Sequence, residues 1–280
     1  MKRGETRNRR ASPAEGVRNP RLPFDAAAEE RRITAFIRKT VRQAGARGVV
    51  LGLSGGVDSS VVCALCTRAL GEDRVMGILM PSASTPADDI KDARQLAGAL
   101  GIESREVRID GLVKGLLAAL DLDGSKIARA NLQARTRMTI LYFYANTLSR
   151  LVVGTGDRSE IMLGFFTKYG DGGVDFLPIG HLYKTEVRGL GRHLGLGRRI
   201  TTKPSSPQLW PGHRATDELP ADYDKLDLVL HYLLAAGLAP DEVAARAGTD
   251  RSVVGRVSEM NRRSAHKRAP PFGIGREEGA

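Results

Sequence analysis

The stretch GVVLGLSGGVDSSVVCALCTRAL, residues 48–70, places two adjacent glycines between two apolar runs. The first run, GVVLGL, predicts a buried strand, and the run from about residue 58 to residue 70 predicts a helix. Gly55 and Gly56 lie in the turn between them. A glycine-rich turn lets the backbone approach an anion closely, and the positive end of the following helix attracts it. The stretch therefore predicts a phosphate site.

This turn lacks the Gly-Lys-Ser/Thr ending of the common NTPase phosphate loop and has Asp58 instead. An aspartate repels bound phosphate unless a cation lies between them, which favours a magnesium ion. The same residues also fit a tight strand–helix turn in which Asp58 only caps the helix.

Outward from this stretch, strand and helix patterns alternate. A helix is predicted over residues 26–45 with Asp25 as its cap, strands over 74–80, 105–110 and 151–156, and helices over 86–101 and 126–150. This alternation predicts an α/β fold, a parallel sheet with helices on both faces, followed by C-terminal helical additions. Ligands of such sheets bind beyond the carboxyl ends of the strands, so LGLSGG and VVGTGDRSE should face one crevice.

The chain has 280 residues and a formal net charge of +11. Part of this charge lies near the start, where residues 1–22 hold seven Lys or Arg against two Glu. We expect residues 1–24 to form a disordered basic tail and residues 25–280 to form a single domain. The sequence has no apolar run long enough to cross a membrane and only two cysteines, which favours a cytoplasmic protein.

SGGVDSS, residues 54–60, resembles the signature of the N-type ATP pyrophosphatases, which cleave ATP between the α- and β-phosphates. Four further segments resemble the NAD synthetases: NLQARTRM (131–138), GTGDRSE (154–160), GFFTKYGDGG (164–173) and AHKR (265–268). The resemblance implies an adenine nucleotide alpha hydrolase-like fold. It also implies ATP-dependent amidation of deamido-NAD to NAD with ammonia, through an adenylated intermediate, releasing AMP and pyrophosphate. The alternative is an N-type ATP pyrophosphatase that acts on another carboxylate or on tRNA.

The resemblance also implies roles for individual residues. ATP, the co-substrate, would contact Gly52, Leu53, Ser54, Gly55, Gly56, Val57, Asp58, Ser59, Thr155, Lys184 and Ser205. Deamido-NAD would contact Arg135, Lys168, Asp175, His266 and Lys267. Asp58 and Glu160 would bind Mg²⁺. The catalytic residues would be Asp58, Lys184 and Asp171, with Asp171 accepting a proton from ammonium.

Several other features leave alternatives open. DEVAARAGTDRSVVGRVSEMNRR, residues 241–263, resembles a DNA-binding helix-turn-helix but also fits two helices that close an enzyme core. Cys63 and Cys66 have the spacing of a redox pair but fit buried apolar positions in a helix better. The apolar residues of the 126–150 helix occupy more than one face, which predicts a homodimer. Residues 203–219 are expected to close over ATP, and a separate glutaminase partner is not excluded.

Overall fold

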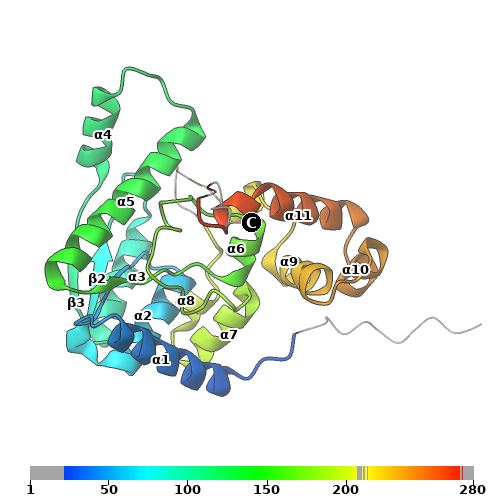
Figure 1. Cartoon of the computed structure of the whole chain (residues 1–280), viewed down its shortest axis with the longest axis horizontal. Coiled ribbons are helices and arrows are strands. Elements are labelled where there is room, and N and C mark those ends of the chain that lie inside the picture. Colours follow the sequence, from blue (N-terminus) through cyan, green and yellow to red (C-terminus); the bar gives the residue numbers. More distant parts are fainter. Residues whose placement is uncertain (1–21, 207–209, 211, 213, 272, 274–280) are drawn as a thin grey trace, which may run out of the picture.

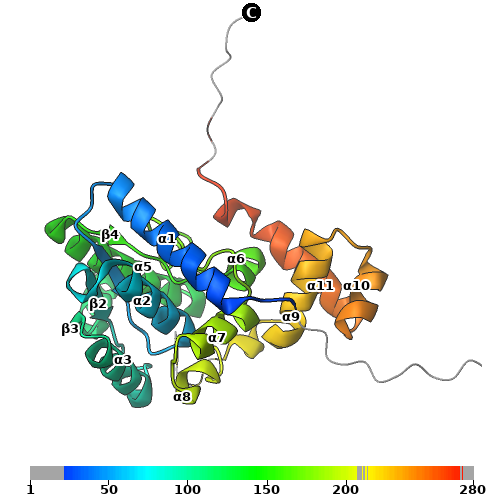
Figure 2. The same cartoon turned by 90° about the horizontal axis from the view of Figure 1, so that it is seen from below.

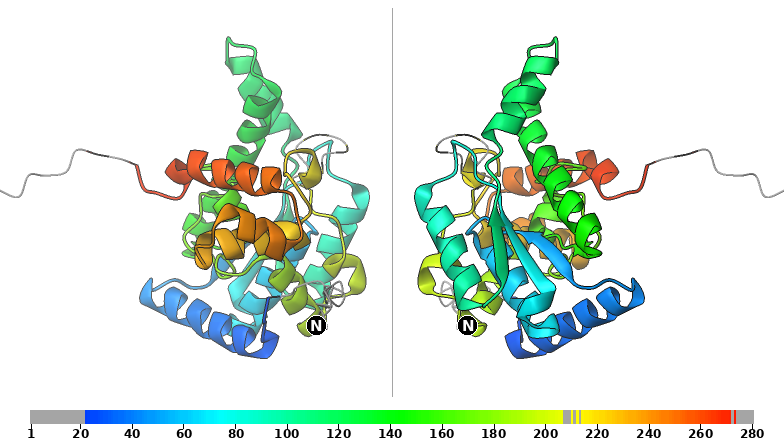
Figure 3. Two further views of the ribbon diagram at one scale, coloured as in Figure 1. Left: turned by 90° about the vertical axis from the view of Figure 1, so that its right-hand side faces the viewer. Right: turned by 90° about the vertical axis from the view of Figure 1, so that its left-hand side faces the viewer.

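A parallel sheet of four strands, in the order β3–β2–β1–β4, forms the core of the first half of the chain. Figures 1 and 3 show where this sheet lies among the helices. The structure is a computed structural model that describes residues 22–206, 210, 212, 214–271 and 273. The strands are β1 (Val49–Gly52), β2 (Val75–Leu79), β3 (Glu103–Glu106) and β4 (Leu151–Val152). Val49 of β1 lies opposite Val75 on one side and Leu151 on the other. The carboxyl ends of the strands therefore meet at one edge, as the sequence predicts.

Alternate residues of the strands point to opposite faces of the sheet, and helices cover both faces. Val49 and Leu51 belong to a buried cluster with α1 (Ala26–Gln43), α2 (Val57–Leu70), α3 (Ala87–Ala99) and α7 (Lys184–His193). Val50 points the other way and packs with residues of α5 (Lys126–Leu148). The prediction of an α/β fold with helices on both faces is confirmed.

Helix α1 begins where its cap predicts. The Asp25 carboxylate accepts a hydrogen bond from the Ala28 N–H at 3.0 Å. Just before it, Leu22 and Phe24 pack against the buried clusters. Residues 1–21, most of the expected basic tail, lie outside the described residues.

Strand β3 begins two residues earlier than predicted and ends at Glu106, and the unpredicted helix α4 (Asp110–Ala119) follows it. It forms one edge of the sheet and its residues are mostly exposed. Glu103 pairs with Arg105 at 2.8 Å, while Arg94 of α3 pairs with Glu106. Charged side chains therefore cover this edge.

The C-terminal helices form a second buried cluster beside the sheet (Figure 2). The remaining helices are α6 (Arg158–Leu163), α8 (Arg198–Thr201), α9 (Tyr223–Leu230), α10 (Pro240–Ala247) and α11 (Arg251–Arg263), with a π-helical turn at His231–Ala235 and 3₁₀ turns at Glu72–Arg74, Ala215–Asp217 and Ala265–Lys267. The apolar residues of the helix-turn-helix-like segment, among them Val243 and Val257, are buried against α9. They form core, as the second interpretation of that segment predicts. None of the helices described is long and apolar enough to span a bilayer.

Candidate active site

A cavity of about 780 Å³ opens at the carboxyl edge of the strands. Its volume is within the range usual for sites that bind small molecules. Many residues with an implied role line it: Gly52, Leu53, Ser54, Gly56, Val57, Asp58, Ser59, Thr155, Glu160, Asp171, Ser205 and Lys267. The expected lid lines it in part, through Lys203 to Ser206 and Trp210, whereas residues 207–209, 211 and 213 lie outside the described residues.

Hydrogen bonds made by its own serines fix the conformation of the phosphate-binding turn. The hydroxyls of Ser54 and Ser59 lie 3.1 Å apart, and the Gly56 N–H donates to Ser54 Oγ at 3.3 Å. Gly56 is the N-cap of α2 and makes no side-chain cap bond. The first N–H groups of α2 have no partner within the helix, so they are available to an anion in the cavity.

Gly55 serves the packing of the turn against α3. Its φ is +75°, and a Cβ there would lie 2.2 Å from the Asp89 carbonyl oxygen. Its own carbonyl accepts from Lys203 Nζ at 3.0 Å. The same ammonium donates to Asp89 and Asp92, both at 2.6 Å. Lys203 thus connects the phosphate-binding turn, α3 and the start of the 203–219 loop, a role that the sequence did not reveal.

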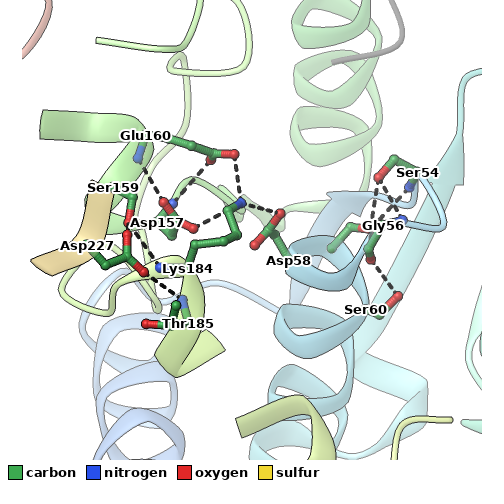
Figure 4. Close-up of polar contacts among 11 residues, drawn as sticks. Ser54, Gly56, Asp58, Ser60, Asp157, Ser159, Glu160, Lys184, Thr185 and Asp227 are labelled. Carbon is green, nitrogen blue, oxygen red and sulfur yellow. Dashed lines mark hydrogen bonds and ion pairs between the residues drawn. The ribbon is translucent and has the colours of Figure 1, made fainter. Parts of the chain in front are cut away.

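Lys184 is fully buried and lies among three carboxylates (Figure 4). Its Nζ is 2.7 Å from Asp58, 2.8 Å from Glu160 and 2.9 Å from Asp157. Asp58 comes from the first turn of α2, Glu160 from the first turn of α6, and Lys184 itself begins α7. The structure therefore brings together Asp58, Glu160 and Lys184, which the sequence groups only by resemblance.

Asp157 is the member of this cluster that the sequence did not identify. It is the N-cap of α6 and forms a capping box with Glu160: Asp157 Oδ1 accepts from the Glu160 N–H at 2.8 Å. An Asp followed three residues later by Glu, before an apolar run, is the sequence signal for such a box. That signal was present in DRSEIML, residues 157–163.

The charges in this cluster oppose one another. Burial and the neighbouring carboxylates raise the pKa of Asp157 and of Glu160, whereas the Lys184 ammonium lowers both. The carboxylates in turn raise the pKa of Lys184 well above its ordinary value. Lys184 therefore stays positively charged, and the cluster has more acidic groups than it has cations to pair with them.

The donor set of the cluster suits Mg²⁺, which prefers carboxylate oxygens. Asp58 Oδ1 is buried and has no hydrogen-bond partner among the described residues. No group of three or more His, Cys, Asp or Glu in the described part of the chain has the arrangement of a metal site. Lys184 Nζ lies between Asp58 and Glu160 and pairs with both carboxylates.

A second buried contact holds the residues behind Lys184 in place. Asp227 of α9 accepts from the Ser159 hydroxyl at 2.5 Å and from the Thr185 N–H at 2.8 Å (Figure 4). Ser159 Oγ accepts from the Lys184 N–H at 3.0 Å. Asp227 is 1% exposed. One carboxylate thus joins the starts of α6 and α7 to the C-terminal helices.

Asp171 lies on the far wall of the cavity. Its Oδ1 accepts from the Thr167 N–H at 2.8 Å. Burial of the carboxyl beside the cavity raises its pKa, and the hydrogen bonds from Thr167 lower it, while another part of the residue stays exposed to solvent. Arg137 also lines the cavity and donates to the Met80 carbonyl at 3.1 Å. Its position beside Asp171 was not foreseen from the sequence.

Most residues implied for deamido-NAD lie outside the cavity wall. Arg135 donates to the Lys168 carbonyl at 3.3 Å, and Lys168 Nζ donates to the His266 carbonyl at 2.7 Å. Lys267 does line the cavity, where its Nζ donates to the Gly164 and Phe166 carbonyls, both at 2.7 Å. These residues form one connected group beside the cavity.

Asp175 takes part in the sheet. Its carboxylate accepts from the Val152 N–H at 2.7 Å and from the Tyr142 hydroxyl at 3.0 Å. Both carboxylate oxygens therefore already have a partner. The carboxylate remains exposed, so it lies at the surface near α5 rather than in the cavity.

Comparisons with known proteins agree with this geometry. The family model for NAD synthase matches residues 29–271. The NH₃-dependent NAD⁺ synthetase of Hyperthermus butylicus is 48% identical over 254 residues, which cover 90% of this chain and 92% of that protein. The enzyme of the same description from Archaeoglobus fulgidus is 48% identical over 251 residues, covering 89% of this chain and 96% of that protein.

Two solved structures superpose on this chain with 30% sequence identity. The NMN synthetase of Francisella tularensis gives a TM-score of 0.80, with 90% of this chain and 99% of that chain covered. The NH₃-dependent NAD synthetase of Campylobacter jejuni gives 0.76, with 90% and 100% covered. A family model that spans nearly the whole chain, together with relatives of almost half identical sequence, shows that the chain belongs to the NAD synthase family.

Proposed function

We propose that this protein converts deamido-NAD into NAD by ATP-dependent amidation with ammonia, and releases AMP and pyrophosphate. The observation that carries the proposal is the Lys184 cluster beside the phosphate-binding turn, with Asp58 and Glu160 on the wall of one cavity. A carboxylate is a poor acceptor for ammonia. Transfer of AMP to the nicotinate carboxylate turns it into a mixed anhydride, from which AMP can leave.

The residues of the chain divide this chemistry between them. The turn Ser54–Ser59 and the start of α2 bind the β- and γ-phosphates, which leave as pyrophosphate. Lys184 neutralises the negative charge that builds up during the transfer. Asp58 and Glu160 would hold Mg²⁺, which would supply further charge neutralisation for the phosphates. Thr155 and Ser205 contact ATP from the loops that line the cavity.

Ammonium must lose a proton before it can attack the anhydride. Asp171 faces the cavity, and its raised pKa makes it a better proton acceptor than an ordinary aspartate. We assign this proton transfer to Asp171. Lys267 binds deamido-NAD from the cavity wall, and Arg135, Lys168, Asp175 and His266 bind it from the surface outside the cavity.

We further infer that the protein is a homodimer formed through α4 and α5. Large apolar side chains are exposed on and between these helices: Leu112, Leu116, Leu120, Leu122, Ile127 and Phe143, with Leu122 82% and Phe143 69% exposed. Helix α4 and the beginning of α5 project from the rest of the molecule (Figures 1 and 3). Such a patch on one helical layer is typical of a protein interface. A second copy packed on α5 would also cover the residues proposed to bind deamido-NAD, one of which, Arg135, belongs to α5.

A second candidate function is amidation of nicotinate mononucleotide, a smaller substrate that carries the same nicotinate carboxylate. It is favoured by the superposition on a solved NMN synthetase with a TM-score of 0.80. The cavity chemistry is the same for both substrates, because both present a nicotinate carboxylate.

Both free thiols are buried, and this supports a cytoplasmic enzyme.

The test is incubation of the purified chain with ATP, magnesium and ammonium, together with either deamido-NAD or nicotinate mononucleotide. NAD, AMP and pyrophosphate in equal amounts are the expected products with deamido-NAD. Faster turnover of the mononucleotide would favour the second candidate. Glutamine in place of ammonium should give no product, because burial raises the pKa of Cys63 to about 12 and leaves no thiolate for an amidase.

A further inference from the structure

Three polar atoms of residues on the cavity wall are buried and have no hydrogen-bond partner among the described residues. They are Asp58 Oδ1, Ser205 Oγ and Tyr223 Oη. A buried polar atom without a partner destabilises the folded state, so folded proteins rarely retain one without a reason. Asp58 and Ser205 have proposed ligands, namely the metal ion and ATP. Tyr223 has none.

Tyr223 lies at the phosphate end of the cavity. It is the first residue of α9 and is 5% exposed. Lys184 Nζ lies 5.2 Å from the centre of its ring. The charges that act on its hydroxyl belong to the same cluster, with Glu160 the strongest.

The hydroxyl carries a proton that it can donate in a hydrogen bond. Burial and the carboxylates around it raise the pKa of Tyr223 far above its ordinary value, so the proton stays on the oxygen. The Tyr223 hydroxyl lies near Glu160 and Lys184. Such a donor suits an anionic acceptor that arrives with its own cation, because the cation offsets the repulsion from the carboxylate. A phosphate oxygen of a nucleoside triphosphate is such an acceptor.

We propose that Tyr223 is a further ligand-binding residue of this site, whose hydroxyl donates a hydrogen bond to a phosphate oxygen of bound ATP. The proposal deepens the proposed function and rests on it for the identity of the nucleotide. It assigns a role in the reaction to α9, a helix of the C-terminal additions.

The test compares wild type with Tyr223→Phe, which removes only the oxygen. Thermal unfolding of the full chain is measured alone and with magnesium and α,β-methylene-ATP, an analogue that cannot be cleaved at the reacting bond. Free Tyr223→Phe should melt at the wild-type temperature or above it, because the unpaired oxygen is gone. The analogue should raise its melting temperature less than that of wild type, and kcat/KM for ATP should fall roughly ten- to a hundredfold. Tyr232→Phe, on the neighbouring π-helical turn outside the cavity wall, is the matched control and should behave as wild type.

Three results would overturn the proposal. Tyr223→Phe could equal wild type both in analogue binding and in kcat/KM for ATP. The free variant could melt several degrees lower, which would mean that the hydroxyl has a protein partner. The analogue could also fail to stabilise wild type. If wild type binds the analogue but makes no NAD, the proposed amidation fails while the comparison of analogue binding still decides the role of Tyr223.

Discussion

Among single residues, Asp58 is one whose substitution should lower turnover much more than it lowers stability. Its side chain is 21% exposed and accepts one bond from Lys184. Asn retains an oxygen for that bond but loses the negative charge that Mg²⁺ requires. We expect Asp58→Asn to change the free energy of unfolding by less than about 1 kcal/mol. Turnover should fall at least roughly a hundredfold. Steady-state kinetics and urea unfolding measure the two effects, and a variant that retains near-full activity would exclude the assigned metal role.

Gly55, in contrast, is a residue whose substitution should lower stability, because the turn needs its backbone conformation and its lack of a side chain. Ala at this position has to adopt a φ of +75° and places its Cβ 2.2 Å from the Asp89 carbonyl. Gly55→Ala should therefore destabilise the fold by about 1–3 kcal/mol and displace the phosphate-binding turn. Gly98→Ala, on α3 with open space at its Cβ, is the control and should stabilise by about 0.5–1 kcal/mol. Equal unfolding free energies for the two variants would contradict the packing argument.

Between elements, Asp227 joins α9 to the starts of α6 and α7. Burial raises its pKa to about 6, while Ser159 and Thr185 lower it. Because the folded state binds this proton more tightly than the unfolded chain, the residue's contribution to stability decreases as the pH rises from about 4 to about 6. It remains at its lower value at neutral pH.

Asp227→Asn should remove this dependence. The difference in unfolding free energy between wild type and variant should change by up to roughly 1.4 kcal/mol per pH unit within that window. Turnover should fall about tenfold, because the Ser159 hydroxyl or the Thr185 N–H loses its acceptor. Asp224→Asn, exposed on the same helix, is the control. Parallel stability curves for wild type and Asp227→Asn would rule out the assigned pKa.

The sequence predicts elements well where the local signal is strong. The cap at Asp25 and the glycine turn after β1 place α1, β1 and α2 to within a residue or two. It fails at α4, where Leu112 and Leu116 are exposed and no residue is fully buried, so the helix has only a weak core-facing pattern. The cluster around Lys184 joins residues 126 positions apart, and no local pattern reports that distance. Only the family resemblance grouped Asp58 with Lys184, and it did not include Asp157 or Tyr223.

For the whole molecule, the decisive question is assembly. Phe143 is 69% exposed on α5, and a charge there should prevent a second copy from packing. We expect Phe143→Lys to be monomeric by light scattering and to have a raised KM for deamido-NAD. The free energy of unfolding per chain should decrease, because the dimer no longer contributes to it. Leu234→Lys, at an exposed apolar residue of the C-terminal part, is the control and should leave the dimer intact. A fully active monomeric wild type would contradict the interface.

The charged edge strand β3 bears on how readily the protein aggregates at high protein concentration. A parallel sheet folds slowly because its strands pair over long distances in the chain, and partly folded copies expose open edges meanwhile. With Glu103, Arg105 and Glu106 along the outer strand, a strand from another molecule would have to bury several charges in order to add to the sheet. This edge should therefore resist aggregation, and neutral substitutions there should lower the yield of soluble protein before they lower activity.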